Sequence, residues 1–158
     1  MAGAGIMPSR LLTDLDIRLQ PWAGRLVIDS AAIGYKIIID CTYRSNAEQD
    51  ADYAQGRTAP GAIITHARAG ESAHNCTLPD GTPAARGFDI AVYSAGGLVL
   101  DWDAADIAWK SVLNIGRNYK NVDGSPTLQL GADWPLDVRD NPHLELFNWA
   151  SLSPPVLS

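Results

Sequence analysis

The chain has 158 residues, of which 46% are hydrophobic, and it carries a formal net charge of −6. This length suits one hydrophobic core, so we expect a single domain over 1–158, with its core at about 11–147 and a tail at 151–158. An acidic chain without a basic stripe excludes binding to nucleic acid, which depends on Lys and Arg at the phosphates.

The sequence also lacks the signals of membrane and secreted proteins. The longest apolar run, "YKIIIDC", is interrupted by Lys36 and Asp40 and is far shorter than the roughly 20 residues that cross a bilayer. No basic segment followed by an apolar one opens the chain, so we expect neither a secretory signal nor membrane insertion. Two cysteines, Cys41 and Cys76, indicate free thiols in a reducing cytoplasm.

The first third of the chain is predicted to be helical and then to form a strand. Apolar spacing over 9–33 fits a helix better than a strand, and Pro21 is expected to divide this region into two short helices. The β-branched run "YKIIIDCTY", 35–43, predicts a buried strand.

A capped helix and a short strand are expected next. Ser45 with Glu48 three residues later has the pattern of a capping box, and the helix it begins should extend to Gly56. The segment "AIITHA", 62–67, is predicted to be a short strand.

The second half of the chain is predicted to be mainly strands. They are expected over 87–94, 96–102, 128–134 and 143–149, with an amphipathic helix over 103–120 that has Asp103 near its start. Helices and strands mix without a βαβ rhythm. We therefore expect an α+β fold, with a small antiparallel sheet flanked by helices.

Few residues of the chain suit metal chemistry. The histidines are His66, His74 and His143. A hydrolytic zinc site needs three protein ligands and one open position for water, which His74, Asp89 and His143 could supply as two imidazoles and a carboxylate. On spacing alone, surface histidines and a capping aspartate remain the more common interpretation.

Two further residues could take part in catalysis. Asp140 precedes His143 by three residues and could act as a general base, although "DNP" also suits a simple turn before a strand. Arg44 follows a predicted strand and precedes a helix cap. Its guanidinium could hold a substrate carboxylate or an oxyanion, or it could be an ordinary surface arginine.

Four segments in order resemble one known family. They are "TYRSNAEQDADYAQGRT", "ITHARAGESAHN", "GFDIAV" and "GADWPLDVRDNPHLEL", and the similarity extends over about 11–147. Together they resemble the zinc peptidases that comprise L-alanyl-D-glutamate endopeptidases and D-alanyl-D-alanine carboxypeptidases, and among these the phage L-alanyl-D-glutamate endolysins most. The resemblance implies a hedgehog/DD-peptidase-like fold and a Zn²⁺ cofactor.

The resemblance also implies roles for individual residues. His74, Asp89 and His143 match the three zinc ligands, Asp140 matches the catalytic base, and Arg44 matches the arginine that contacts substrate or intermediate. A supporting or substrate-binding role is implied for four others: Ser72, Gln49, Arg57 and Trp134.

One interval departs from the family pattern. Family members place the aspartate ligand seven positions after the first histidine, whereas Asp89 follows His74 by fifteen. The insert at 76–84 must then form a loop that returns the chain to the metal, which costs little because doubling a loop adds only about 0.6 kcal/mol. Asp80 is the rival ligand. We prefer Asp89, because "PDGTP" is a turn signature that has its own use for Asp80.

By this resemblance the protein is an enzyme, a monomeric zinc metallopeptidase that hydrolyses the peptidoglycan stem peptide at the L-Ala–D-Glu bond. As a phage or prophage endolysin it would be made in the host cytoplasm and reach the periplasmic cell wall through a holin. A D,D- or L,D-carboxypeptidase of peptidoglycan is one alternative. A non-catalytic cell-wall-binding or phage structural protein is another.

Overall fold

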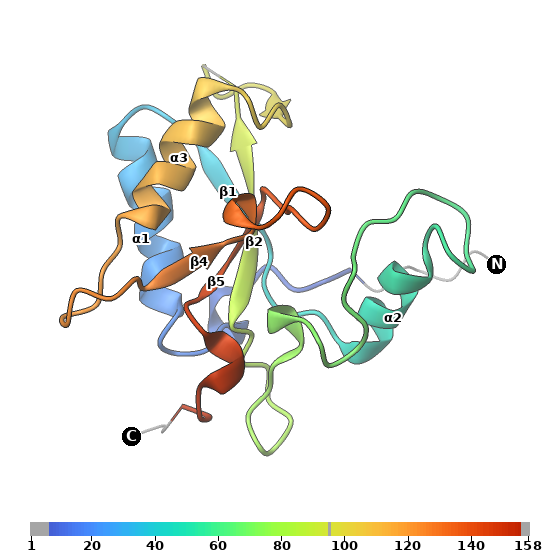
Figure 1. Ribbon diagram of the computed structural model, residues 1–158. Helices are drawn as coiled ribbons and strands as arrows, with labels where there is room; N and C mark the ends of the chain where they lie inside the picture. Colours follow the sequence, from blue (N-terminus) through green and yellow to red (C-terminus); the bar gives the residue numbers. More distant parts are fainter. Residues whose placement is uncertain (1–6, 95, 156–158) are drawn as a thin grey trace.

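The computed structural model describes residues 7–94 and 96–155. An antiparallel sheet has the strand order β1-β2-β5-β4, with β3 paired to the end of β2 (Figure 1). The strands are β1 (Ile37–Cys41), β2 (Gly87–Tyr93), β3 (Leu100–Asp101), β4 (Leu128–Leu130) and β5 (His143–Leu146). The helices are α1 (Gln20–Ala32), α2 (Asn46–Ala54) and α3 (Ile107–Arg117). The predicted α+β class with an antiparallel sheet is confirmed.

One face of the sheet is covered by α1 and α3, which lie side by side (Figure 1). Every second residue of a strand points to the same face, so alternate strand positions meet these helices. The strand residues of the core are apolar: Ile37, Phe88, Ile90, Val92, Leu128, Leu130, Leu144 and Leu146. Trp109 of α3 and Leu26 of α1 pack into the same cluster. The intervening strand positions are left for the opposite face.

The predicted pair of helices over 9–33 is wrong. Pro21 lies in the first turn of α1, where its missing N–H has no intrahelical partner to lose, instead of separating two helices. Before α1 the chain forms only a short 3-10 turn, Leu12–Asp14. A helix cannot continue through this segment, because its backbone is bonded to Ala85. The Ala85 N–H donates to the Asp14 carbonyl, and the Asp16 N–H donates to the Ala85 carbonyl.

The capping box predicted for α2 is confirmed. The Ser45 hydroxyl accepts a hydrogen bond from the Glu48 backbone N–H, and the Glu48 carboxylate accepts one from the Ser45 N–H. The helix ends at Ala54, slightly before the predicted Gly56. The start predicted for α3 is too early, because Asp106 rather than Asp103 caps this helix by accepting a hydrogen bond from the Ala108 N–H.

Several predicted strands are shortened or do not form. Residues 62–67 have no strand partner among the described residues. The strand predicted over 128–134 stops early because Gly131–Asp133 turns into a 3-10 helix. The strand predicted over 143–149 ends before Asn148, whose left-handed backbone, with φ of 55°, breaks it. Only Leu100–Asp101 of the segment 96–102 is paired.

The described start of the predicted tail is attached to the core. Trp149–Ser151 forms a 3-10 turn, and the Arg86 guanidinium donates hydrogen bonds to the carbonyls of Trp149 and Leu152. The Arg18 guanidinium donates a hydrogen bond to the Ser153 carbonyl. The last residues of that tail, 156–158, lie outside the described residues.

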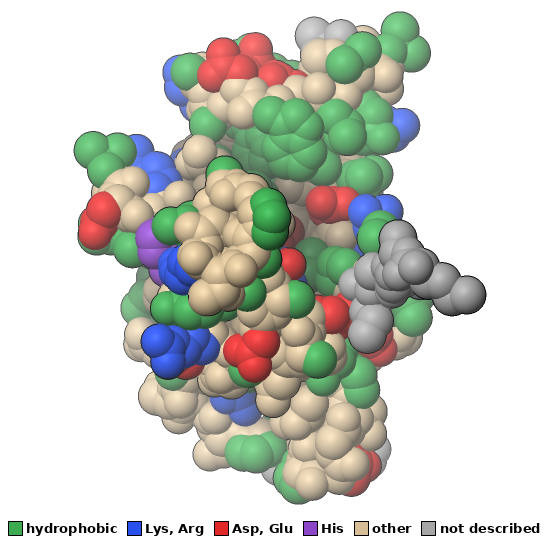
Figure 2. Space-filling view, turned by 90° about the vertical axis from the view of Figure 1, so that its right-hand side faces the viewer, with side chains coloured by type: hydrophobic (Ala, Val, Ile, Leu, Met, Phe, Trp, Pro, Cys, Tyr) green, Lys and Arg blue, Asp and Glu red, His purple; other side chains and the backbone are tan. Residues whose placement is uncertain are grey.

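Two further expectations concern membranes and nucleic acid. Within the described residues, no helix has the length and apolarity needed to cross a membrane. On the face shown in Figure 2, the described Lys and Arg side chains are scattered among acidic and apolar ones and form no continuous basic patch. Nothing on this face suggests binding to a phosphate backbone.

Candidate metal centre

The face of the sheet away from α1 and α3 carries polar side chains at the same strands that build the core. Asp89 in β2 and His143 in β5 are cross-strand partners, and Glu145 follows His143 on the same face. Their neighbours Phe88 and Leu144 point into the core. Because successive side chains of a strand point to opposite faces of the sheet, one stretch of sequence supplies core residues to one face and these polar residues to the other.

A bulge in β1 brings another residue to this face. Ile39 pairs with Ile90, but Cys41 pairs with Asp89, so one extra residue, Asp40, lies between the two pairs. An extra residue reverses which face the following side chains occupy. Cys41 is thereby placed opposite Asp89, on the site face, although Ile39 packs against the core.

His74 reaches the site from a 3-10 turn, Ala73–Asn75, that precedes β2. The Ser72 hydroxyl caps this turn by accepting a hydrogen bond from the His74 N–H. The turn is fixed to the end of β1, because the Arg44 N–H donates to the His74 carbonyl and the Asn75 amide donates to the Arg44 carbonyl. Ser72 therefore positions His74 as well as lining the cavity described below.

Three potential ligand atoms converge at the site. Asp89 Oδ1 lies 3.2 Å from His74 Nε2 and 3.0 Å from His143 Nδ1, and the two nitrogens lie 3.1 Å apart. A tetrahedral zinc ion with bonds of about 2.0–2.2 Å would hold its ligands about 3.3–3.6 Å apart. The three side chains are therefore close to the arrangement that such an ion requires.

Hydrogen bonds on the outer side of each imidazole determine which nitrogen faces the site. His74 Nδ1 lies 2.6 Å from the Thr42 carbonyl oxygen, and His143 Nε2 lies 2.9 Å from Glu145 Oε2. In a neutral imidazole, each of these acceptors takes the single ring proton on the outer nitrogen, which leaves a lone pair on the inner one. Two lone pairs and a carboxylate oxygen then face one another, an arrangement that a cation would stabilise.

The pKa values reflect this concentration of charge. Burial alone would lower the pKa of His74, yet the charge and hydrogen bond of Asp89 raise it well above its usual range. Burial would also lower the pKa of His143, but its hydrogen bonds with Asp89 and Glu145 raise it. For Asp89, burial raises the pKa, and the nearby histidines outweigh that effect and hold it well below its usual range. The carboxylate is thus ionised and available to a cation.

Asp140 lies beside this cluster. Oxygen and nitrogen atoms of Asp89, Asp140 and His143 lie within 4.8 Å of one another. Burial and the neighbouring Asp89 carboxylate raise the pKa of Asp140 above its usual value. A carboxylate with raised basicity at this position could accept a proton from a water molecule in the site, or could itself be a ligand.

Gly131 allows Asp140 to approach the sheet. The Asp140 N–H donates to the Gly131 carbonyl, and the Asp140 carbonyl in turn accepts from the His143 N–H. A side chain at position 131 would collide with the Asp140 backbone. Glycine is needed here for close backbone contact, not for a special backbone angle.

Arg44 is held against the cluster by several acidic and polar groups. Its Nη2 lies 3.8 Å from Asp89 Oδ2, its Nε lies 3.3 Å from Asp52 Oδ2, and its Nη1 donates to Gln49 Oε1 at 3.3 Å. Burial lowers the pKa of Arg44, but the neighbouring Cys41, Asp89 and Asp52 outweigh that effect and raise it. The guanidinium is largely buried, with 16% of the side chain exposed, and its remaining surface lines the cavity.

A cavity of about 460 Å³ opens over the three converging side chains. It is lined by the two histidines and Asp89, by Arg44, Asp140 and Glu145, and by a wall that includes Ser72, Trp134 and 63–67. The Trp134 ring lies beside the His143 ring, with the ring centres 5.3 Å apart. His66 lies in the exposed part of this wall, whereas Arg57 does not line the cavity.

Gln49 and Arg57 support that wall. Gln49 is completely buried and donates to Thr65 Oγ1 and to the Ala67 carbonyl. Arg57 lies over the Tyr53 ring at 3.9 Å and donates to the Thr65 carbonyl. Both residues thus act on the cavity through the segment that they hold.

The structure adds Glu145, Cys41 and the Thr42 carbonyl to the residues found by sequence reasoning. Glu145 is buried between His143 and Gln129, whose amide donates to Glu145 Oε1 at 3.0 Å. Its position two residues after His143 in a strand could have indicated a shared face. The Cys41 placement depends on the bulge, for which the sequence has no signal.

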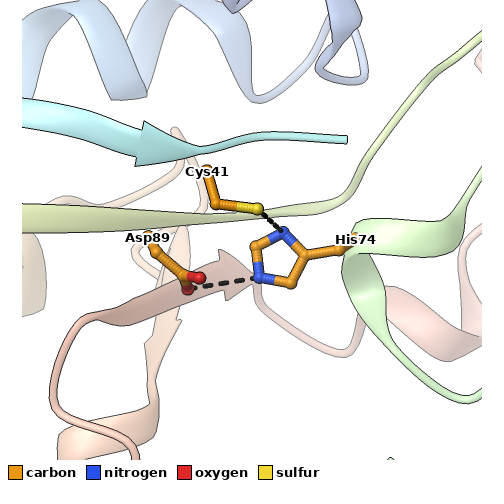
Figure 3. A group of neighbouring side chains, drawn as sticks. All are labelled: Cys41, His74 and Asp89. Carbon is orange, nitrogen blue, oxygen red and sulfur yellow. Dashed lines mark hydrogen bonds and ion pairs between the residues drawn. The ribbon is translucent and has the colours of Figure 1, made fainter. Parts of the chain in front are cut away.

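Cys41 lies on the outer side of the His74 ring. Figure 3 shows the Cys41 sulfur beside His74 Nδ1 and the Asp89 carboxylate beside Nε2, at opposite edges of the imidazole. Cys41, His74 and Asp89 are close enough to form a metal-binding group, but the Nδ1 edge is already occupied by the Thr42 carbonyl. Cys41 is therefore better placed to support the His74 ring than to replace a ligand.

The insert at 76–84 forms a closed loop. Thr77 and Pro83 form an isolated antiparallel bridge, and Cys76 and Ala84 are joined by a backbone hydrogen bond. Asp80 sits at the tip, where its carboxylate accepts from the Thr82 N–H. No residue of the insert lines the cavity, so the structure brings Asp89 and not Asp80 to the histidines.

Gly87 provides the space in which His143 lies. A Cβ at this position would come within 2.8 Å of the His143 ring and 2.9 Å of the Ala73 side chain. The absence of a side chain at this point lets the ring from β5 lie across β2. The sheet, the turn before β2 and the ring are thus packed against one another without room for another methyl group.

Comparison with known proteins identifies a relative of the chain. No family model matches the chain. The chain is 31% identical, over 141 residues, to the peptidoglycan L-alanyl-D-glutamate endopeptidase CwlK of Bacillus subtilis (strain 168), and the alignment covers 85% of this chain and 74% of that protein. With this identity over most of both proteins, the chain belongs to the family of the peptidoglycan L-alanyl-D-glutamate endopeptidase CwlK.

Proposed function

We propose that this protein is a zinc-dependent peptidase that cleaves the peptide stem of peptidoglycan at the L-alanyl-D-glutamate bond. The convergence of His74 Nε2, Asp89 Oδ1 and His143 Nδ1 in a cavity is the observation that carries the proposal. Membership of the CwlK family supports the same scissile bond, since CwlK is a peptidoglycan L-alanyl-D-glutamate endopeptidase.

His74, Asp89 and His143 would hold the metal. Two imidazoles and one carboxylate form a donor set found in catalytic zinc sites, which keep a further position open. Zinc bound there would lower the pKa of water and polarise the scissile carbonyl. The hydrogen bonds from the outer nitrogens of both histidines to Thr42 and Glu145 keep the rings in the required orientation.

Asp140 would move the protons. Its carboxylate takes a proton from the attacking water and later gives it to the departing amine of D-glutamate. The raised pKa of Asp140 favours this role, because a carboxylate that is more basic than usual accepts a proton more readily.

Arg44 would stabilise the negative charge that develops on the scissile carbonyl oxygen. It lines the cavity next to Asp89, and its guanidinium is fixed in place by Asp52 and Gln49. A fixed, partly buried cation requires little reorganisation during the reaction, which makes it effective in stabilising a transition state. Trp134 and Ser72 border the same space and complete the binding surface.

The test is product analysis by mass spectrometry. Purified peptidoglycan is digested with the zinc-loaded protein, with and without a chelator, and the released fragments are identified. We expect free N-terminal D-glutamate on the peptides, and no release after chelation. Release of terminal D-alanine instead would identify a carboxypeptidase. A protein that binds zinc but releases no fragment would contradict the proposal.

We further propose that the activity serves wall lysis, the role of the phage endolysins whose motifs the chain resembles. The support is that resemblance. An endolysin of this kind is made in the host cytoplasm and reaches the wall through a holin. Expression in bacteria with and without a holin tests this role: rapid lysis should require both proteins. Lysis that is independent of the holin, or absent with it, would contradict the proposed route.

A further inference from the structure

The segment 62–67 has the sequence of a strand but no strand partner among the residues that the structure describes. It contains the β-branched run Ile63, Ile64 and Thr65, and it runs from Ala62 to Thr65 without a turn. Figure 1 shows it within the wide loop that connects α2 to the turn before β2. An unpaired strand-like segment exposes backbone donors and acceptors that can bind another chain.

One side of this segment is used within the protein. The Ile63 nitrogen packs against Gly56, the Thr65 carbonyl accepts from Arg57 at 3.2 Å, and the Ala67 carbonyl accepts from Gln49 at 2.8 Å. The Ala62 carbonyl also accepts a hydrogen bond, from the Gln55 amide at 3.0 Å. That side of the segment faces α2 and the turn that follows it.

The backbone N–H and C=O groups of Ile64 and His66, which lie between these residues, are not held in this way. Neither residue makes a backbone hydrogen bond to any other described residue. The whole stretch 63–67 lines the cavity that contains His74, Asp89 and His143. Free backbone groups are thus available beside the candidate metal centre.

The supporting side chains make the segment a preformed surface. Gln49 is completely buried, and its single amide joins the segment to Arg44 at the site. The Arg57 guanidinium is held by the Tyr53 ring and the Tyr53 carbonyl. Ordering a binding surface in advance reduces the entropy that must be lost when a ligand binds.

We propose that 63–66 is the docking edge for the substrate, and that the peptide stem binds along it as an added strand through the backbone of Ile64 and His66. The inference rests on the proposed function, which makes the occupant of the cavity a peptide. Recognition by main-chain hydrogen bonds reads the peptide backbone and not its side chains. This suits a substrate in which L- and D-residues alternate around the L-alanyl-D-glutamate bond.

Amide hydrogen exchange measured by NMR tests the pairing directly. The zinc-loaded Asp140→Asn protein is mixed with disaccharide-tetrapeptide muropeptides prepared with a muramidase. We expect slower exchange at the amides of Ile64 and His66, by about tenfold or more, on addition of muropeptide. The exposed amide of Val122, in a remote loop, should exchange at an unchanged rate. Bound muropeptide without any slowing at 64 or 66 would overturn the inference.

A second measurement uses the wild-type active site. Ile64→Pro removes the backbone N–H group of residue 64. The matched control Ile64→Ala shortens the side chain but keeps this N–H group. We expect KM for muropeptide cleavage to rise about fivefold in Ile64→Pro and less than about twofold in Ile64→Ala, consistent with one lost hydrogen bond. Zinc content should be equal in both. Equal KM values in the two variants would contradict the pairing.

Other outcomes distinguish this inference from the proposed function. Protection at Ile64 that depends on protein concentration and not on muropeptide would show that a second copy of the chain uses this edge. That result would overturn the inference while leaving cleavage intact. Failure of the wild-type protein to bind or cleave muropeptides would instead remove the proposed function, and with it the occupant assumed here.

Discussion

The two faces of the sheet differ in composition although they are built from the same strands. Toward α1 and α3, residues such as Phe88 and Leu144 are completely buried in an apolar core. Toward the cavity, their neighbours Asp89 and His143 bring charged and titratable groups together. The comparison shows how one strand can carry stability on one face and chemistry on the other, because successive side chains point in opposite directions.

The largest expected effect is on the cavity face. Asp89→Ala should lose bound zinc and reduce cleavage to background, because it removes the group that contacts both histidines. Asp80→Ala is the matched control, since Asp80 accepts a hydrogen bond only within the insert turn. Zinc per chain, measured by atomic emission, and released peptide are the readouts. Zinc loss in Asp80→Ala but not in Asp89→Ala would reverse our choice of ligand.

A slightly smaller loss is expected for the proposed base. Asp140→Asn should retain zinc and lower kcat by about 10²–10⁴-fold, because the amide cannot accept the proton. Asp140 must be ionised to act, so activity should fall as the pH drops through its pKa. Since that pKa is raised, the fall should begin at a higher pH than for an ordinary aspartate. Loss of zinc in Asp140→Asn would make Asp140 a ligand instead.

The core face should respond through stability. Phe88→Ala, one residue before Asp89, should lower the free energy of unfolding by about 3–5 kcal/mol, because Phe88 is fully buried in the core. The folded variant should still bind zinc. Urea denaturation of the metal-free protein measures the effect, and Phe88→Leu, which retains more apolar volume, should cost less. An unchanged unfolding free energy would contradict the separation of the two faces.

The smallest effect is expected at Glu145, which faces the cavity but touches the metal site only through His143. Glu145→Ala should weaken zinc affinity by about 10–100-fold, because His143 loses the acceptor that fixes its outer proton. Glu145→Gln retains an oxygen that can accept this hydrogen bond, so it should weaken affinity less. Competition with a chelating dye measures both, and equal affinity in Glu145→Ala and wild type would exclude a positioning role.

Local patterns predicted the elements that depend on neighbouring residues. The α2 capping box needs only Ser45 and Glu48, and the apolar runs that become β1 and β2 are visible in the sequence. The order of the family motifs also singled out His74, Asp89 and His143, which the structure brings together. Their binding of zinc, and the role of Asp140, stay predictions.

Predictions failed where distant segments compete for the backbone. The chain before α1 could not continue as a helix because Ala85, far along the sequence, bonds Asp14 and Asp16. The strand-like segment 62–67 pairs with no described strand, and side chains from α2 and its following turn bond its backbone instead. Propensity describes what a segment favours in isolation, and tertiary partners decide what it forms.

The sequence by itself determined the single acidic α+β chain, its capped helix, its apolar strand positions and the residue types that suit a metal site. Only the tertiary structure decided that the Asp40 bulge places Cys41 at the site, that Glu145 orients His143, and that the insert stays outside the cavity. These features depend on strand register and loop closure between segments far apart in the chain. Local sequence patterns do not encode such pairings, because each is selected by the packing of the whole fold.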